Sequence, residues 1–294
     1  MIQTRCAICG SRKNFKELYK ANFTEKDLRI DVFSARTIPA RCHYRIVKCK
    51  NDGLVRSNPI IDVSTLNKLY KISQFAYQDE TENLTETYLS ALQPVLKTLS
   101  KKNAILEIGC GNGFLLKSLY TEGYHNVFGI EPSVDAVDKA DKRIKKKIIV
   151  EIFKPGLFKK ETFFFIFFFQ TLDHIPDPEK FLKECYKLLA PGGYIMAFNH
   201  NIDSLEVKIF GAKSPIIDIV HPFFFSPKTL RMIFEKFKFN GINVYSPKNT
   251  LSLRHLIWLI PLPGFIKNRI LKLDFLKKVT LKFELGNICI VGQK

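Results

Sequence analysis

From Asn103 onward, short apolar segments alternate with stretches in which apolar residues recur every three or four positions. This alternation predicts the strands and helices of an α/β protein with a mainly parallel sheet. The run Phe163–Phe169 is apolar throughout, which is typical of a strand buried on both faces. Strands are expected at Ala104–Ile108, Val127–Ile130, Ile148–Ile152, Phe163–Phe169, Tyr194–Phe198, Ile242–Tyr245 and Asn287–Val291, and the last two should pair antiparallel.

Helices are predicted between these strands. They are expected at about Phe114–Glu122, from Ser133 to Ala140, at Pro178–Leu189 and from Pro227 to Lys238. Asp177 is placed to cap the third helix, with Pro178 at its first position. The segment Pro191-Gly192-Gly193 is expected to end that helix and to separate it from the next strand.

The chain divides by composition into three parts. Residues 1–62 hold four of the seven Cys and several turn signals, so they are predicted to form a small separate module. Residues 63–100 have the apolar spacing of connecting helices. Residues 101–294 should form the main domain, with a basic insertion at about 247–285 between its last two strands.

Composition narrows the class of protein. A chain of 294 residues with 46% hydrophobic content is long and apolar enough to bury a core. No apolar run reaches the roughly 18 residues that span a bilayer. The first residues, Met1–Gly10, also lack the pattern of a signal peptide. A cytoplasmic protein is therefore expected.

The formal net charge of +18 suggests a polyanionic partner at first sight. However, the chain has 35 Lys against 11 Arg, whereas Arg is the residue that recognises bases and phosphates with paired hydrogen bonds. An AT-rich genome favours Lys, Phe, Ile and Asn together, so base composition competes with function as the cause of the charge. A nucleic-acid partner is not expected.

The segment Glu107–Gly113 reads Glu-Ile-Gly-Cys-Gly-Asn-Gly and connects a predicted strand to a predicted helix. Glycines at alternate positions let backbone amides approach a ligand closely, beside the N-terminus of the helix. The third glycine of a dinucleotide fingerprint is missing, because Phe114 or Leu116 stands where it would fall. A nicotinamide-dependent oxidoreductase is therefore the weaker alternative.

An acidic residue follows at the end of the second predicted strand. Glu131 lies 22 residues after Gly109. A carboxylate at this place can accept hydrogen bonds from both hydroxyls of a ribose, as the acid does in nucleoside-binding α/β folds. Together with the glycine turn, Glu131 predicts a ligand that contains a nucleoside.

The chain resembles the class I S-adenosylmethionine-dependent methyltransferases over residues of about 103–200. Four segments carry the resemblance in the family's order, namely Glu107–Gly113, Gly129–Pro132, Gln170–Pro178 and Leu189–Gly193. It implies an α/β fold with a Rossmann-like, seven-stranded, mostly parallel sheet whose last strand is antiparallel. It also implies that the glycine turn binds the methionine part of the cofactor and that Glu131 binds the ribose.

The resemblance implies a set of cofactor-binding residues: Glu107, Gly109, Cys110, Gly111, Gly113, Glu131, Pro132, Glu151, Ile152 and Gln170. Glu151 and Ile152 stand where the family binds adenine, although the family often has Asp there. Gln170 stands beside the reacting methyl group. Relatives usually begin the fourth strand with Asp, which Phe163–Phe165 does not supply, so a non-catalytic cofactor-binding protein is a further alternative.

Methyl transfer from a sulfonium is an in-line displacement, so catalysis is mainly alignment, with a base when the acceptor carries a proton. His174, beside Asp173 in the loop after the fourth strand, is the first candidate for this base. His200 and His221 are further candidates, and the alternative is that Asp173 and His174 only shape the loop. The family resemblance implies a small-molecule or sugar-like acceptor.

The N-terminal cysteines have metal-ligand spacing. Cys6 and Cys9 form a Cys-x-x-Cys pair, and Cys49 is followed by Asp52 where a fourth thiolate is expected. The segment resembles the N-terminal zinc module of a subset of class I methyltransferases that includes sugar C-methyltransferases. Either these four residues bind a structural zinc ion, or Cys42 or His43 replaces Asp52, or the cysteines are buried without metal.

The C-terminal third is basic. Between residues 205 and 294 there are 15 Lys and Arg against 5 Asp and Glu. Within it, Lys267–Lys282 mixes Lys with Leu, Ile and Phe, which favours an amphipathic helix that lies on the sheet. The alternatives are a lid over the acceptor and a surface that contacts an anionic membrane from the cytoplasm.

Overall fold

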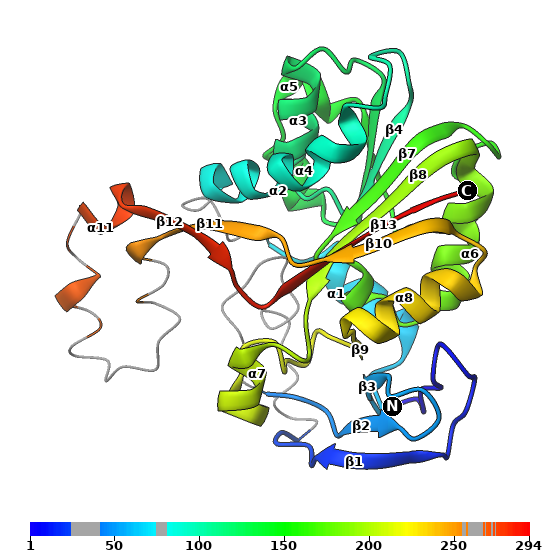
Figure 1. Cartoon of the computed structure of the whole chain (residues 1–294), viewed down its shortest axis with the longest axis vertical. Coiled ribbons are helices and arrows are strands. Elements are labelled where there is room, and N and C mark those ends of the chain that lie inside the picture. The colour runs from blue at the N-terminus through cyan, green and yellow to red at the C-terminus, as the bar shows by residue number, and fades with distance from the viewer. Residues whose placement is uncertain are drawn as a thin grey trace.

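The computed structural model describes residues 1–24, 42–74, 81–254, 257, 267, 269–271, 273 and 275–294. Its centre is a seven-stranded sheet in the order β10-β13-β8-β7-β4-β5-β6 (Figure 1). The strands are β4 (Ile105–Ile108), β5 (Val127–Glu131), β6 (Ile148–Val150), β7 (Phe163–Phe169), β8 (Leu189–His200), β10 (Asn240–Tyr245) and β13 (Asn287–Gln293). β13 runs antiparallel to β8 and β10, and the other pairs are parallel. The predicted sheet is confirmed.

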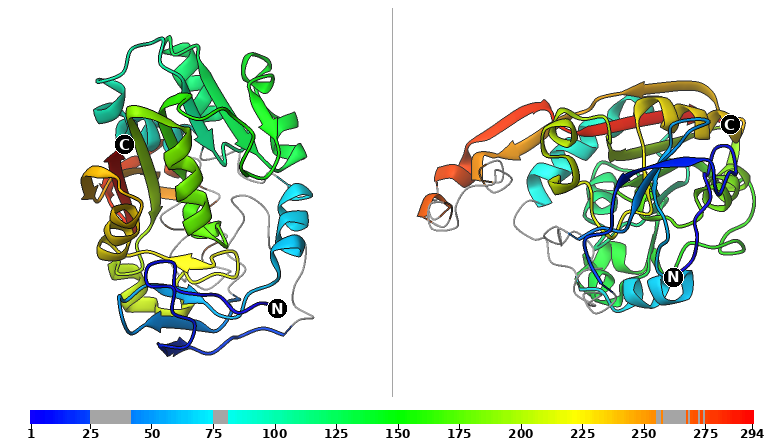
Figure 2. Two further views of the ribbon diagram at one scale, coloured as in Figure 1. Left: turned by 90° about the vertical axis from the view of Figure 1, so that its right-hand side faces the viewer. Right: turned by 90° about the horizontal axis from the view of Figure 1, so that it is seen from below.

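Helices cover both faces of this sheet (Figures 1 and 2). One face is packed by α2 (Thr81–Leu96), α3 (Phe114–Thr121), α4 (Val134–Asp138) and α5 (Lys142–Lys145), and the other by α6 (Pro178–Leu188) and α8 (Pro227–Lys236). The Asp177 carboxylate accepts a hydrogen bond from the backbone N–H of Lys180 and caps α6 as predicted. The helix expected from Ser133 to Ala140 ends at Asp138. A second short helix, α5, begins after Asp141, whose side chain caps it.

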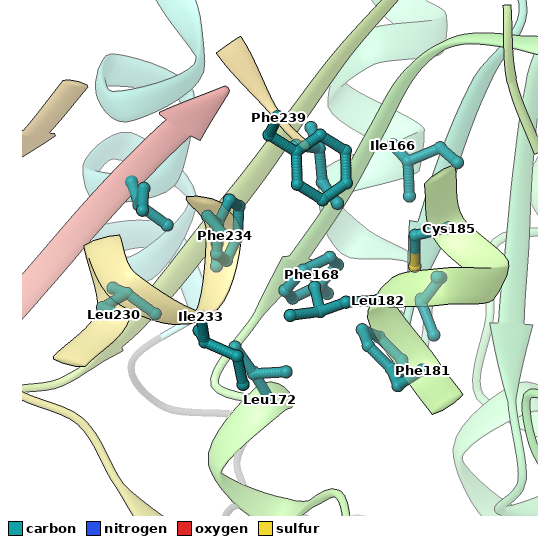
Figure 3. Packing of buried hydrophobic residues seen from close by; sticks show 14 of the residues in the cluster. Ile166, Phe168, Leu172, Phe181, Leu182, Cys185, Leu230, Ile233, Phe234 and Phe239 are labelled. Atoms are coloured by element: carbon teal, nitrogen blue, oxygen red, sulfur yellow. The ribbon is translucent and has the colours of Figure 1, made fainter. Parts of the chain in front are cut away.

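The strand β7 is the centre of the hydrophobic core. Phe165 and Phe167 pack on the side of α2 and α3, whereas Ile166 and Phe168 pack on the side of α6 and α8. Figure 3 shows this second side, where Phe168 lies among side chains of α6 and α8. Successive side chains of a strand point to opposite faces, so the uninterrupted apolar run is explained by burial on both sides, as predicted.

The N-terminal residues form a second, smaller sheet. It consists of β1 (Phe15–Tyr19), β2 (Ile46–Cys49) and β3 (Val55–Ser57), and it is completed by β9 (Phe223–Phe224) from much later in the chain. All of its pairs are antiparallel. The helix α1 (Val63–Lys71) then leads towards the main sheet, and Asp62 caps it. The predicted boundary of the N-terminal module at residue 62 stays a prediction, because the sheet of this module also contains β9, which belongs to the predicted main domain.

The strand β8 begins earlier than expected. The segment Pro191-Gly192-Gly193 does not end α6 or separate it from the strand, because α6 ends at Leu188 and β8 starts at Leu189 and continues through the glycines. A Cβ atom on Gly193 would lie 2.9 Å from the carbonyl oxygen of Ala190 and 3.2 Å from that of Phe163. Gly193 is therefore needed because backbone atoms approach it closely. It does not mark a break between a helix and a strand.

The basic C-terminal region also differs from expectation where it is described. The strands β11 (Lys248–Ser252) and β12 (Thr280–Glu284) pair antiparallel and extend away from the main sheet (Figure 1). The short helix α11 (Phe275–Lys278) precedes β12. The expected amphipathic helix on the sheet is therefore wrong for residues 280–282. Of the apolar stretch 255–266, only residue 257 belongs to the described residues.

A third group of elements lies between β8 and β9. It consists of α7 (Leu205–Phe210) and a short 3-10 helix, η4 (Gly211–Lys213).

Of the helices described, none is both long enough and apolar enough to cross a membrane. Contact with an anionic membrane surface stays a prediction.

Two substitutions in β7 test the packing. Phe168→Ala should lower the free energy of unfolding by about 3–5 kcal/mol, because Phe168 is fully buried and its ring centroid lies 4.9 Å from that of Phe181. Phe164 in the same strand is 41% exposed, so Phe164→Ala should cost under about 1 kcal/mol. Urea unfolding of both variants measures the difference, and equal losses would contradict the packing described here.

Candidate functional site

The glycine turn connects β4 to α3 at the carboxyl edge of the sheet. Gly109, Gly111 and Gly113 have backbone φ angles of +77°, +56° and +69°, which residues other than glycine rarely adopt. The backbone N–H of Gly109 donates to the carbonyl oxygen of Ile130 at 2.8 Å and so ties the turn to β5. No side chain caps the N-terminus of α3, where Gly113 stands. The helix therefore presents its N-terminal end at the turn.

Glu131 joins the glycine turn directly. Its carboxylate accepts a hydrogen bond from the backbone N–H of Gly111 at 2.8 Å and another from that of Ser133 at 2.9 Å. Glu131 is 5% exposed, at the end of β5. The structure thus brings together the two motifs on which the nucleoside prediction depends.

The remaining residues expected to contact the cofactor differ in how far they are buried. Glu107 and Cys110 are buried within and just after β4, and Pro132 is half-buried beside Glu131. Gln170 follows β7 with a φ of +49° and donates through Nε2 to Oδ1 of Asn287 at 3.3 Å. Its Oε1 atom is buried and has no hydrogen-bond partner in the described ranges of the chain, so it is suited to accept from a ligand.

Glu151, expected near the adenine, makes several contacts with protein groups. Its carboxylate lies 3.0 Å from Nζ of Lys71 and 2.8 Å from that of Lys154, and it accepts from the backbone N–H of Ile152. The hydrogen bond from Lys154, then that from Ile152 and that from Lys71, lowers the pKa of Glu151 to about 2. Glu151 is therefore charged at neutral pH and engaged with two cations, while Ile152 is half-buried beside it.

The candidate catalytic residues form one cluster with an aspartate at its centre. Asp173 and His174 belong to the 3-10 helix η3 (Leu172–His174), which follows β7, and His200 ends β8. The ring centroid of His221 lies 4.6 Å from that of His174 and 5.4 Å from that of His200. The fold therefore collects the three predicted histidines around Asp173, which is 2% exposed.

Burial controls the protonation of this cluster. It lowers the pKa of His174 to about 3, with a further contribution from His221, and that of His200 to about 4. Burial alone would raise the pKa of Asp173, but His174, His221 and His200 outweigh it and the net shift is downward. Near neutral pH, His174 and His200 are therefore neutral and Asp173 is ionised.

Tyr70 is a member of this cluster that the sequence analysis missed. Its hydroxyl lies 3.1 Å from Nδ1 of His174, although the two residues are 104 positions apart. Tyr70 is in α1, where it reads as one more apolar position of a connecting helix. Asn112 in the glycine turn and Asn199 in β8 were also given no role, and each has a buried side-chain oxygen without a hydrogen-bond partner among the described residues. No local pattern marks Tyr70 or Asn199, whereas Asn112 lies within the glycine motif.

The N-terminal cysteines meet as predicted from their spacing. The ligand atoms of Cys6, Cys9, Cys49 and Asp52 all lie within 4.8 Å of one another. Oδ2 of Asp52 is 3.0 Å from Sγ of Cys6 and 3.4 Å from that of Cys49. Asp52 thus lies in one group with Cys6, Cys9 and Cys49.

The two residues considered as replacements for Asp52 lie elsewhere. Cys42 packs against a separate hydrophobic cluster around Tyr44. The Nδ1 atom of His43 hydrogen-bonds the carbonyl oxygen of Tyr44 at 2.8 Å. Neither Cys42 nor His43 belongs to the group of neighbouring ligand atoms among the described residues.

A buried arginine accompanies this cysteine group. Arg56 in β3 is fully buried, and its Nε and Nη1 atoms have no hydrogen-bond partner among the residues that the structure describes. Burial lowers the pKa of Arg56, whereas the charges of Cys6, Cys49 and Asp52 act to raise it. The positive guanidinium lies beside three thiols and a carboxylate. It offsets the negative charge that the thiols and the carboxylate carry when they are deprotonated.

Known proteins match most of the chain. Residues 81–244 match the methyltransferase domain family. The ubiquinone biosynthesis O-methyltransferase of Paraburkholderia phymatum is 31% identical over 161 residues, 50% of this chain and 69% of that protein. The protein of the same name from Coxiella burnetii is 29% identical over 126 residues, 40% of this chain and 52% of that protein. A solved S-adenosylmethionine-dependent methyltransferase from Archaeoglobus fulgidus aligns with a TM-score of 0.51 and 19% identity, over 73% of this chain and 97% of that one.

The fold, with its antiparallel last strand, is that of the class I S-adenosylmethionine-dependent methyltransferases. The match to the family covers more than half of this chain, so the chain belongs to the methyltransferase domain family. Methyl transfer is therefore favoured over the nicotinamide-dependent oxidation considered from the sequence.

The glycine turn gives a test of the site's geometry. Gly109→Ala should destabilise the protein more than Gly156→Ala, because both glycines have positive φ but only Gly109 is crowded. A Cβ atom on Gly109 would lie 2.5 Å from Oγ1 of Thr171, whereas nothing lies within 4 Å of one on Gly156. We expect about 1–2 kcal/mol for each from backbone strain and about 1–3 kcal/mol more for Gly109→Ala from the clash.

Urea unfolding measures both effects, and the double variant Gly109→Ala, Thr171→Ala should recover part of the extra loss. Equal destabilisation by Gly109→Ala and Gly156→Ala would show that Thr171 does not pack against the turn.

Proposed function

We propose that this enzyme transfers the methyl group of S-adenosylmethionine to a hydroxyl group of a small molecule. The observation that carries the proposal is the contact between Glu131 and Gly111, which unites an acidic strand end with a glycine turn. This pairing suits a ligand that combines a ribose with a charged amino-acid part. Accordingly, Glu131 would bind the ribose hydroxyls, and the turn from Gly109 to Gly113 would bind the methionine part.

Unsatisfied polar atoms near the turn support a bound cofactor. The buried side-chain oxygens of Asn112 and Gln170 have no hydrogen-bond partner among the described residues. Buried polar atoms are normally paired, so these oxygens are suited to accept from a ligand. When bound, S-adenosylmethionine supplies an electrophilic methyl group on a sulfonium sulfur.

The acceptor is argued from the relatives and from the histidine cluster. The two curated relatives described above are named as O-methyltransferases, which favours a hydroxyl over a carbon acceptor. Oxygen methylation needs a group that accepts the hydroxyl proton, and neutral His174 can do so. Tyr70 would hold the imidazole of His174 through its Nδ1 atom, leaving Nε2 for the acceptor. A sugar-like acceptor stays the second candidate, on the resemblance of the N-terminal module alone.

The N-terminal module is proposed to bind one structural zinc ion through Cys6, Cys9, Cys49 and Asp52. The proximity of the four side chains supports this. Burial raises the pKa of the thiols of Cys6 and Cys49, so without a cation these groups stay protonated. Zinc would displace their protons, and a four-ligand site leaves no open position for chemistry.

Cofactor binding is tested by removing the acid. Glu131→Ala should weaken binding of S-adenosylhomocysteine by roughly 100-fold or more, because each hydrogen bond to a charged group contributes about 1.5–3 kcal/mol. Asp138→Asn is the matched control, since its side chain is 64% exposed and pairs only with Lys145 in the structure described. Isothermal titration calorimetry measures both. Unchanged affinity in Glu131→Ala would refute the assigned role, and no binding to the wild type would refute the proposed function.

Zinc is tested by elemental analysis. Cys49→Ser should contain about one zinc ion per chain less than the wild type, because three protein ligands remain in a site that needs four. Cys42→Ser, outside the group, should keep the wild-type content. The same content in all three proteins would mean that the cysteine group is metal-free.

A further inference from the structure

We propose that Asp173, His200 and His221 bind a divalent transition-metal ion, and that this ion holds the acceptor through an oxygen atom. The ligand atoms of the three residues all lie within 4.8 Å of one another. Among the described residues, they form one of two such groups, the other being the N-terminal cysteine group. The metal site stands on its own observations, whereas the role for the acceptor rests on the proposed function.

Three separate segments deliver these ligands to one place. Asp173 lies in η3 after β7, and His200 is the last residue of β8. His221 lies two residues before the start of the strand β9, and Ser57 in β3 holds it there. The hydroxyl of Ser57 donates to the carbonyl oxygen of His221 at 2.8 Å, and its N–H donates to that of Pro222 at 2.9 Å. The N-terminal sheet thus positions one of the three ligands.

The hydrogen bond of His221 shows which nitrogen faces the site. Its Nδ1 atom lies 2.8 Å from the carbonyl oxygen of Ile216, so Nδ1 carries a proton and donates it. In a neutral imidazole, Nε2 then has a free lone pair. This atom faces Oδ2 of Asp173 at 3.9 Å, too far for a hydrogen bond. A backbone carbonyl that orients a histidine in this way is the usual support of a metal ligand.

The carboxylate of Asp173 makes no hydrogen bond in the part of the chain that the structure describes. Both of its oxygens are buried without a partner there, and no described Lys or Arg lies within ion-pair distance of it. The titratable groups that face it are His174, His200 and His221, with Tyr70 beyond His174. A buried carboxylate next to imidazole lone pairs is unfavourable unless a cation lies between them.

The donor set suits a first-row transition metal. Two imidazoles and one carboxylate occupy one side of a coordination sphere and leave positions open for other ligands. At metal–ligand distances of about 2.0–2.2 Å, ligand atoms lie about 3–3.5 Å apart, so small side-chain rotations would close the site. A triad with open positions is typical of a metal that takes part in binding or chemistry, in contrast to the closed cysteine group.

The site lies on the same edge of the sheet as the proposed methyl donor. Thr171 links the two, because its hydroxyl is 3.3 Å from the carbonyl oxygen of Ile108 and it packs against Gly109, while Asp173 is two residues further on. An acceptor oxygen bound to the ion would therefore be presented towards the glycine turn. This arrangement favours acceptors with an ionisable hydroxyl next to a second oxygen, such as catechols, which bind an ion through both atoms.

The transfer step then balances simply. A cation held by Asp173, His200 and His221 would lower the pKa of the acceptor hydroxyl, and the imidazole of His174 would accept the proton of that hydroxyl. The oxygen forms a bond with the methyl carbon as the carbon–sulfur bond breaks, and the electron pair stays on sulfur. The products are a methyl ether and S-adenosylhomocysteine, and the proton leaves His174 for solvent. No oxidation or reduction takes place.

Binding of Mn²⁺ tests the proposal without any acceptor. Mn²⁺ prefers oxygen and nitrogen ligands to thiolates, so it avoids the cysteine group. Titration followed by the electron paramagnetic resonance of free Mn²⁺ should show one tight site in the wild type. Asp173→Asn and His221→Gln should each weaken this site by at least about 10- to 100-fold.

Two controls separate the outcomes. His125→Gln removes an exposed histidine and should bind Mn²⁺ like the wild type. Both site variants should keep the wild-type affinity for S-adenosylhomocysteine. Equal Mn²⁺ binding in the wild type and Asp173→Asn, or none in either, would overturn the metal site. Loss of S-adenosylhomocysteine binding by the wild type would instead refute the cofactor assignment alone.

Discussion

The candidate site depends on the anchoring of two backbone segments by one buried carboxylate. Glu131 accepts from the N–H groups of Gly111 and Ser133, which lie on either side of the carboxyl end of β5. Because an unpaired buried N–H is costly, these two bonds stabilise the turn and the start of α4 in a single arrangement. The parallel sheet then places the ends of β7 and β8 beside them, where the other candidate residues lie.

A second constraint comes from the burial of charge at this edge. Asp173, His200 and His221 lie close together, and no Lys or Arg in the described part of the chain pairs with the aspartate. Structural stability alone would favour apolar residues at such a place. The retention of an acid among histidines therefore points to a task in binding or catalysis, as expected where burial perturbs several neighbouring pKa values.

The two sheets of the protein are linked through this same region. β9 belongs to the N-terminal sheet and begins two residues after His221, and its pairing with β3 places His221 against Ser57. The cysteine group lies at the other end of the strands that β3 joins, with Arg56 buried between. The small N-terminal sheet therefore contributes to the architecture of the site and is more than an appended module.

Local patterns determined much of this protein in advance. The alternation of apolar runs, the glycine turn and Glu131 predicted the sheet, its direction and one side of the site, because periodicity and turn chemistry depend on near neighbours in sequence. The spacing of Cys6, Cys9, Cys49 and Asp52 likewise predicted which residues would meet. Only the tertiary structure decided that Tyr70 approaches His174, that β9 joins the N-terminal sheet, and that residues 248–252 and 280–284 pair as strands. These are contacts between segments tens to more than a hundred positions apart, and no local preference specifies them, since they form only when the whole core is packed.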